Sequence, residues 1–426
     1  MALGRNDYRT LILSALGGAL EFYDFVIFVF FAAVIGKLFF PHDMPDWLRQ
    51  LQTFGIFAAG YLARPLGGIV MAHFGDTLGR KQMFMLSILL MSLPTLAIGL
   101  LPTYAAIGIW APLLLLLLRI LQGAAIGGEV PGAWVFVSEH VEARHVGMAC
   151  GILTAGLTGG ILLGSLVATF VNQHYSPEEL LASGWRAPFI LGGLFGLISV
   201  WLRQWLHETP VFREMQEMQR LAAELPLKAV VRDHRSSVIL TMAMTWLLSA
   251  AIVVMILMTP VLVQKLYAIP AVVALKAGSI ATLTLSMGCI FFGALADRIG
   301  AGRVLVVGSA VLGATSMLFY RSVTPDNIDA LYGLCGFFVG VIGVVPSVAV
   351  RAFPPEVRFS GLSFSYNVAY AVFGGLTPVL VSLLLPKDPL APAHYVLALS
   401  AVGVLIGSYL YRSERRQRLI CATIED

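Results

Sequence analysis

Two carboxylates lie inside a run of apolar residues near the N-terminus. Glu21 and Asp24 interrupt the stretch ALEFYDFVIFVFFAAVIG, residues 19–36, whose other side chains are aliphatic, aromatic or small. Carrying a carboxylate into hydrocarbon costs at least about 2.5 kcal/mol, and acids found there usually belong to an ion pathway or a proton relay. A spacing of three residues places both acids on one helical face, with Tyr23, a candidate substrate-binding residue, on the adjacent flank. We therefore predict that Glu21 and Asp24 carry a proton.

Arg64, in the next apolar run, is the predicted partner of these acids. It lies ten residues before Phe74, so about 15 Å of helix separates it from the end of the run. Beside an arginine a buried carboxylate is held charged, whereas away from it desolvation favours the neutral form. A partner that moves can therefore switch the protonation of Glu21 or Asp24. A permanent ion pair that only locks two helices together remains the alternative interpretation.

A second arginine, Arg119, stands in the fourth apolar run, three residues before Gln122. A guanidinium offers a planar set of donors that fits a carboxylate, so we predict that Arg119 and Gln122 bind a substrate's acidic group. Competition of Arg119 for the proton-bearing acid and an ion pair between helices are the alternatives. Glu129, ten residues further along, is interpreted either as a gate residue or as a second protonatable site.

Composition indicates that these residues lie in a membrane. Of 426 residues, 58% are hydrophobic and only 12% are charged, and the mean hydropathy is +0.84. Apolar runs of about 20 residues, enough to cross roughly 30 Å of hydrocarbon, recur along the whole chain. The predicted spans cover residues 9–36, 50–73, 82–101, 108–138, 147–171, 185–206, 237–263, 271–295, 303–320, 328–352, 359–385 and 393–411.

A polar segment near the middle of the chain, residues 207–235, separates six predicted spans from six others. We therefore predict an N-terminal bundle (residues 1–206), a cytoplasmic linker (residues 207–236) and a C-terminal bundle with a short tail (residues 237–426). Most of the 28 Lys and Arg residues fall at the N-terminus, in even-numbered loops or in the C-terminal tail. The positive-inside rule then places both termini in the cytoplasm.

Several classes of function are excluded by what the sequence lacks. Cys150, Cys289, Cys335 and Cys421 are scattered without metal-ligand spacing, so no metal site, disulfide framework or cofactor is expected. The basic residues do not cluster on a soluble face, which argues against nucleic-acid binding. No nucleotide-binding, zinc-protease or serine-hydrolase motif is present, so an enzyme is not expected. The first apolar run is too long for a cleavable signal and is expected to remain as a membrane span.

Short charged turns repeat at an interval of about half the chain. GDTLGRK (residues 75–81) follows the second span, and ADRIGAGR (residues 296–303) follows the eighth. The spacing E-x-R-x-x-G occurs at residues 142–147 and again at residues 356–361. Glycine permits a tight reversal, and an acid with a base at the membrane surface can bridge neighbouring helix ends. The repeat indicates a duplicated unit of six helices.

The C-terminal half contributes further candidates for a polar cavity. Thr245 and Trp246 lie in the seventh span, and Tyr366, Asn367 and Tyr370 lie in the eleventh. Their hydroxyl, amide and ring groups could orient a small polar solute. Packing between helices is the alternative interpretation for the aromatic residues, and Trp246 could also mark a membrane interface.

With these motifs the chain resembles the major facilitator superfamily along all twelve spans. RILQG (residues 119–123) resembles a motif of proton-coupled members. ALEFYDF, ARPLGG, GWRAPF, ETPVF and PPEVRFSGLSFSYNVAYAVFGGLTP together resemble the metabolite:proton symporter family. Thr77 stands where the superfamily's signature loop usually has arginine. The fifth span lacks the glycine-proline pair of drug:proton antiporters, which argues against efflux.

The resemblance implies an all-α membrane protein with twelve helices in two pseudo-symmetric bundles that work by alternating access. It implies that charged side chains close the cytoplasmic side, namely Asp76, Arg80, Glu139, Arg144, Asp297, Arg303, Glu356 and Arg358.

We expect proton-driven import of a small organic acid or zwitterion across a bacterial inner membrane, by a chain that works as a monomer among membrane lipids. An exporter or an uncoupled facilitator remains the alternative, and the residues do not identify the substrate.

Overall fold

The computed structural model describes residues 5–41, 43–204, 208–217 and 226–425, and these residues are almost entirely helical. Eleven helices are long and apolar enough to cross a membrane, and a twelfth span is formed if the bent pair before α10 is counted as one. The number of spans agrees with the twelve expected from the sequence. No other type of regular structure occurs in the described ranges.

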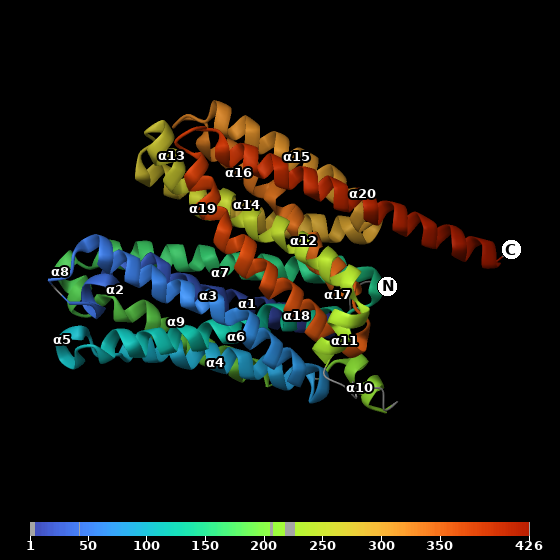
Figure 1. The fold of residues 1–426 in the computed structure, drawn as a ribbon, viewed down its shortest axis with the longest axis horizontal. Helices are drawn as coiled ribbons and strands as arrows, with labels where there is room; N and C mark the ends of the chain where they lie inside the picture. Colours follow the sequence, from blue (N-terminus) through green and yellow to red (C-terminus); the bar gives the residue numbers. More distant parts are fainter. Residues whose placement is uncertain (1–4, 42, 205–207, 218–225, 426) are drawn as a thin grey trace.

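The first bundle is formed by six spans from the N-terminal half. Its helices are α1 (Arg5–Phe30), α3 (Asp46–Thr77), α4 (Arg80–Leu100), α6 (Trp110–His140), α7 (Val146–His174) and α9 (Arg186–Arg203). Three short helices lie at the ends of these spans: α2 (Ala32–Phe39), α5 (Tyr104–Ile107) and α8 (Pro177–Glu179). Figure 1 shows this bundle in blue to green along the lower part of the molecule.

The second bundle repeats the arrangement, and three of its spans contain a short π- or 3₁₀-helical segment between two α-helical parts. The seventh span is α12 (Arg235–Ile252) with α13 (Thr259–Tyr267), the tenth is α16 (Ile328–Val339) with α17 (Val345–Arg351), and the eleventh is α18 (Arg358–Ala369) with α19 (Gly375–Leu384). The eighth, ninth and twelfth spans are α14 (Ala271–Ile299), α15 (Ala301–Ser322) and α20 (Ala391–Glu425). The last helix runs well past the predicted end of the span at residue 411. Residues 412–425 hold no Pro or Gly, and good helix formers continue a helix.

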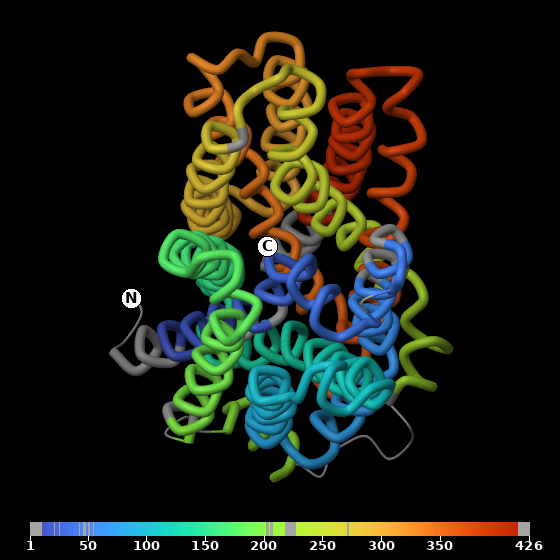
Figure 2. Tube along the Cα trace, turned by 90° about the vertical axis from the view of Figure 1, so that its left-hand side faces the viewer, coloured from blue at the N-terminus to red at the C-terminus, as the bar shows by residue number. Residues whose placement is uncertain are grey.

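Helix pairing follows the same pattern in both bundles. In the first bundle α1 packs on α7, α3 on α6, and α4 on α9; in the second, α12 packs on α18, α14 on α16, and α15 on α20. Figures 1 and 2 show the two bundles as separate sets of helices in both views. The expected fold of two pseudo-symmetric six-helix bundles is confirmed.

The bundles meet along two seams. On one seam α7 packs on α14, where a Cβ added at Gly147 would lie 2.5 Å from the carbonyl oxygen of Gly293. On the other seam α3 and α6 pack on α18. Backbones this close leave room for no side chain, which is a common use of glycine between membrane helices.

The described start of α1 and the end of α20 lie on the same side of the molecule (Figure 1). We call this side the terminal side. The helices between the bundles, α10 (Pro210–Glu217) and α11 (Pro226–Asp233), also lie there.

Candidate functional site

A chain of buried polar side chains begins at Asp24 in α1. The Asp24 carboxylate interacts with the hydroxyl of Thr95 in α4, and Gln122 Nε2 donates to Thr95 Oγ1 over 2.7 Å. Arg119 Nη1 in turn donates to Gln122 Oε1 over 2.8 Å. All four side chains are buried in the N-terminal bundle. The arrangement links an acid to an arginine through two neutral groups that can both accept and donate hydrogen bonds.

Aromatic rings surround the guanidinium of Arg119. Its Cζ lies 4.4 Å from the ring centroid of Phe28 and 5.3 Å from that of Phe57. Arg119 and Gln122, both predicted to bind the substrate's acidic group, contact each other in the structure, while Thr95 was not anticipated. Thr95 is a hydroxyl residue after Pro94 in an apolar span, and its polarity was the only signal that could have drawn attention to it.

Two further candidate residues, Glu21 and Tyr23, lie on α1. Glu21 lies in α1, but its side chain is outside the described part of the structure. The hydroxyl of Tyr23 donates to the carbonyl of Pro188 over 2.9 Å, so this side chain is directed toward α9. The structure therefore does not bring Tyr23 to Arg119 or Arg64.

Arg64 lies in α3 at the interface between the two bundles. Its Cζ is 5.5 Å from the ring centroid of Tyr61, 5.7 Å from that of Tyr366 and 4.4 Å from that of Tyr370. Tyr61 belongs to the first bundle, whereas Tyr366 and Tyr370 belong to the eleventh span of the second. Rings at these distances attract a cation through their quadrupoles.

The Arg64 guanidinium is buried with hydrogen-bonding capacity to spare. Its Nε and Nη2 atoms have no hydrogen-bond partner within the described residues. A buried cation without an anionic partner is costly, so the geometry favours an anion arriving at this position. The predicted candidates Tyr366 and Tyr370 do meet Arg64, and Tyr61 joins them. Sequence reasoning missed Tyr61, although it lies on the face of α3 next to Arg64.

The other predicted cavity residues lie elsewhere. Trp246 Nε1 donates to Tyr395 Oη over 3.2 Å, and its ring stacks on Phe373 within the second bundle. Asn367 Nδ2 donates to the carbonyl of Gly127 over 2.7 Å, which joins the two bundles. The Thr245 hydroxyl is buried, with no hydrogen-bond partner among the described atoms.

Glu129 is buried in α6 and accepts a hydrogen bond from the Ser87 hydroxyl of α4. Both residues belong to the N-terminal bundle. The described contact of Glu129 therefore joins α4 to α6.

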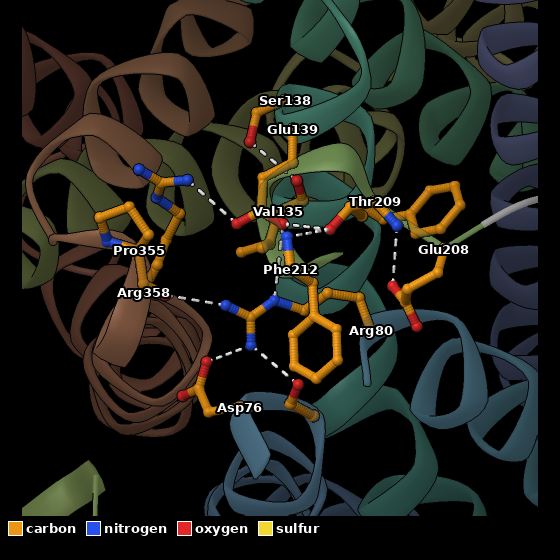
Figure 3. Close-up of polar contacts among 12 residues, drawn as sticks. Asp76, Arg80, Val135, Ser138, Glu139, Glu208, Thr209, Phe212, Pro355 and Arg358 are labelled. Atoms are coloured by element: carbon orange, nitrogen blue, oxygen red, sulfur yellow. Dashed lines mark hydrogen bonds and ion pairs between the residues drawn. The ribbon is translucent and has the colours of Figure 1, made fainter. Parts of the chain in front are cut away.

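A second polar cluster closes the terminal side of the interface (Figure 3). Arg80, at the start of α4, pairs with Asp76 and lies 3.6 Å from Glu139 Oε2, and its Nη2 donates to the carbonyl of Pro355 over 2.9 Å. From the second bundle, Arg358 Nη1 donates to Glu139 Oε1 over 3.0 Å. We call Asp76, Arg80, Glu139 and Arg358 the gate cluster.

The acids of the two repeated turns each cap a helix of the opposite bundle. Asp76 Oδ2 accepts a hydrogen bond of 2.8 Å from the backbone N–H of Ser360 at the start of α18. Asp297 accepts hydrogen bonds of 2.8 Å and 2.7 Å from the N–H groups of Gly147 and Met148 at the start of α7. A helix N-terminus leaves such donors unsatisfied and carries partial positive charge, so both contacts stabilise the association of the bundles.

A further carboxylate also approaches each turn, from the segment between the bundles at the first turn and from α20 at the second. Glu208 Oε2 accepts from the N–H of Lys81 over 3.1 Å, and Glu414 Oε1 accepts from the N–H of Gly302 over 3.4 Å. The turns depend on Gly79 (φ 132°) and Gly300 (φ 95°), which have backbone conformations that other residues rarely adopt. Thr209 extends the gate cluster by donating to Glu139 Oε2 over 2.8 Å.

Four predicted gate residues do not join the gate cluster; one of them is Asp297, which caps α7 instead. Arg144 pairs with Glu142 over 2.7 Å on an exposed surface. Arg303 lies over the ring of Tyr411, 5.2 Å from its centroid. Glu356 lies in the short turn Pro355–Val357 beside the cluster. Arg351, which was not predicted, instead lies 3.8 Å from Asp297 and donates to the carbonyl of Ala143.

Comparison with known proteins gives consistent results. A family model described as Major Facilitator Superfamily matches residues 15–378. The glycine betaine/proline/ectoine/pipecolic acid transporter OusA of Dickeya dadantii is 30% identical, with 94% of this chain and 83% of that protein covered. The proline/betaine transporter of Salmonella typhimurium is 28% identical, with 96% and 84% covered. Among solved structures, the proton:xylose symporter XylE superposes with a TM-score of 0.77 at 15% identity, covering 95% of each chain.

Proposed function

We propose that this chain, which belongs to the major facilitator superfamily of membrane transporters, imports a small zwitterion together with protons. Its membership of the superfamily confirms the expectation of a transporter and not an enzyme. The solute, the coupling ion and the direction of transport are the proposal.

The observation that carries the proposal is the environment of Arg64. An unsatisfied guanidinium edge (Nε and Nη2) lies next to three tyrosine rings drawn from both bundles. A substrate carboxylate would accept hydrogen bonds from the guanidinium, and a methylated or secondary ammonium group would contact the tyrosine rings. Both features occur together in betaines and in proline, the solutes named for the relatives.

Arg64 suits the substrate carboxylate better than Arg119 does, because Arg64 lies among tyrosines from both bundles, whereas Arg119 lies within the first bundle and is linked through Gln122 and Thr95 to Asp24. We therefore assign Arg64 to the substrate and the chain from Asp24 to Arg119 to the proton. The Asp24 Oδ1 atom has no hydrogen-bond partner among the described atoms, so it is the oxygen we propose to accept the proton. Protonation of Asp24 would remove its charge from a buried site before the bundles move.

The gate cluster supports alternating access between the bundles. The Glu139–Arg358 ion pair and the helix caps at Ser360 and Gly147 join one bundle to the other on the terminal side. Breaking them together would open that side, as alternating access requires. We propose that the terminal side faces the cytoplasm of a bacterial cell, in line with its excess of basic residues.

Transport in proteoliposomes tests the proposal. The purified protein is reconstituted, and uptake of labelled glycine betaine and L-proline is followed with the outside acidic, with no gradient, and with the inside acidic. We expect accumulation only with the outside acidic, and loss of uptake for Arg64→Gln. Arg298→Gln, which removes an exposed arginine from the end of α14, is the matched control.

Three results would contradict the proposal. Uptake that equilibrates without responding to the gradient would identify a facilitator, and accumulation driven by the reverse gradient would identify an exporter. Uptake that survives Arg64→Gln at the control's rate would remove Arg64 from the substrate site.

A further inference from the structure

One carbonyl oxygen in α6 lacks its usual partner within the helix. In an α-helix each carbonyl oxygen accepts a hydrogen bond from the N–H group four residues further on. Pro131 stands four residues after Gly127 in α6 and has no N–H group to donate. Both residues are buried, and a buried carbonyl oxygen without a donor is costly. A donor for the Gly127 carbonyl is therefore expected to come from another element.

Two side chains of the second bundle provide that donor. Asn367 Nδ2 in α18 donates to the carbonyl oxygen of Gly127 over 2.7 Å, and Ser363 Oγ donates to the same oxygen over 3.2 Å. Asn367 Nδ2 also donates to the carbonyl oxygen of Ser363 over 2.8 Å. Two carbonyl oxygens thus face the amide nitrogen, which fixes the orientation of the amide group. The buried Asn367 side chain ties α18 to the carbonyl in α6 that Pro131 leaves without a helix partner.

A glycine of α3 makes room for this contact. A Cβ added at Gly68 would lie 2.5 Å from Asn367 Nδ2, 2.7 Å from Ser363 Oγ and 2.8 Å from the carbonyl oxygen of Gly127. A Cβ added at Gly55, on the same helix, would meet no atom of the described residues within 4 Å. Three helices from the two bundles therefore meet at one level. We call Gly68, Gly127, Ser363 and Asn367 the inner lock.

The inner lock lies between the Arg64 site and the gate cluster. On α3, Gly68 comes four residues after Arg64 and eight residues before Asp76, so about 6 Å and 12 Å of helix separate them. On α18, Asn367 comes nine residues after Arg358, or about 14 Å of helix. The level of the inner lock is therefore closed by hydrogen bonds of its own and does not depend on the ion pairs further out.

We propose that Asn367 is a positioning residue that holds the terminal side closed through the carbonyl group of Gly127. When the bundles separate on this side, the Gly127 oxygen exchanges the Asn367 amide for water, which the open path supplies. Asn367 thus acts on the two bundles and not on the solute. The inference rests on the proposed movement of the bundles, but not on the identity of the solute or of the coupling ion.

The opening of the terminal side can be measured by double electron–electron resonance. Spin labels are attached to Leu78→Cys and Ser236→Cys, in a protein without its native cysteines that is reconstituted in nanodiscs. Both positions are exposed, the first after α3 of the first bundle and the second at the start of α12 of the second. We expect the parent protein to give mainly a short distance and the open state to give a longer one.

Two variants remove the inner lock from opposite sides. Asn367→Ala removes the donor, and Pro131→Ala gives the Gly127 carbonyl a donor within its own helix. Each should raise the share of the long distance several-fold. In the double variant the two effects should not add, because both act on one hydrogen bond. Pro94→Ala replaces a proline inside α4, which packs on α9 and α6 of its own bundle, and this matched control should leave the distances unchanged.

A steric variant tests the same contact from α3. Gly68→Ala places a methyl group where the Asn367 amide lies, so it should also raise the share of the long distance. Gly55→Ala adds the same methyl group to the same helix in open space and should have no effect. The variants at Asn367 and Pro131 keep the test decisive if Gly68→Ala does not fold.

Several results would overturn the inner lock. Unchanged distances in Asn367→Ala would remove its role in closure, and a shift of equal size in Pro94→Ala would show a general effect of proline on helix bending. Fully additive shifts in the double variant would separate Asn367 from Pro131. Loss of betaine binding in Asn367→Ala without a change in distance would place this residue at the solute. The uptake assay with Arg64→Gln tests the solute site separately, so failure of the lock and failure of the proposed function are distinguishable.

Discussion

Arg358 at the start of α18 donates a hydrogen bond of 3.0 Å to Glu139 of α6, across the interface of the two bundles. The residues are 219 positions apart in the chain. Glu139 also lies 3.6 Å from Arg80, so one buried carboxylate is shared by two arginines from opposite bundles. When one arginine moves away, the negative charge of this buried carboxylate is less well neutralised. The closed state therefore depends on both contacts.

A comparison of variants at Arg358 and at Arg144 tests the gate cluster. Arg358→Gln should shift the protein toward the state that is open on the terminal side, because Glu139 keeps only one arginine. Labelling of a cysteine placed at Ser363, in the interface below the gate, should rise several-fold from that side. Arg144→Gln removes an arginine whose described ion pair is the local one with Glu142, and its labelling should match that of the parent protein. Equal labelling in the two variants would contradict the assignment of the gate to Arg358.

Removing either of the two helix caps between the bundles should lower the stability of the closed state. Asp76→Asn and Asp297→Asn each weaken the contact with a helix N-terminus in the opposite bundle. Each change should destabilise the closed state by about 1 kcal/mol, the usual scale for a charged cap, with more for Asp76 because it also pairs with Arg80. Thermal unfolding in detergent measures the loss, and Thr77→Ala is the control on the same turn. A loss in only one of the two variants would argue against equivalent roles.

Asp24 should be required for accumulation but not for exchange. Asp24→Asn keeps the size of the side chain and its contact with Thr95, but it cannot release a proton. We expect accumulation under an imposed pH gradient to fall to the background, while exchange of labelled for unlabelled solute continues. Glu179→Gln, at an exposed acid in α8, is the control. Accumulation by Asp24→Asn at the parent's level would remove Asp24 from the proton pathway.

The ring of Tyr370 should contribute to affinity for a quaternary ammonium group. Tyr370→Leu removes the ring that lies 4.4 Å from the Arg64 guanidinium, whereas Tyr370→Phe keeps it. A cation on a ring is stabilised by about 1 kcal/mol, so the KM for glycine betaine should rise about fivefold in the first variant and change little in the second. If the KM for glycine betaine rose by the same factor in Tyr370→Phe, the affinity would depend on the hydroxyl of Tyr370 and not on its ring.

Much of the fold could be predicted from hydropathy alone. The spans in the structure begin and end within several residues of those expected, because a run of apolar residues must be helical where no water can satisfy the backbone. The extension of α20 was not predicted, since a charged helix beyond the membrane leaves no hydropathy signal. The π- and 3₁₀-helical segments in the seventh, tenth and eleventh spans were not predicted either, because their residues are as apolar as those of the α-helices on both sides.

Less of the candidate site could be predicted. Arg119 with Gln122 and Asp76 with Arg80 are neighbours on one helix or one turn, so spacing identifies them. Tyr61 and Thr95 are ordinary residues of a membrane helix, and nothing in their local sequence distinguishes them from packing residues. Arg144 and Arg351 show the reverse case, because a repeated motif pointed to the first while the structure brings the second to Asp297.

The sequence by itself determined that this chain crosses the membrane about twelve times, that its halves are duplicated, and that acids and arginines lie deep within its spans. Only the tertiary structure decided that Asp76 and Asp297 cap helices of the opposite bundle and that Arg64 meets tyrosines from both. Helical periodicity fixes which side chains share a face of one helix, whereas contacts between helices depend on packing that joins residues hundreds of positions apart. Where the two bundles meet, the chemistry of this transporter is therefore a property of the assembled fold.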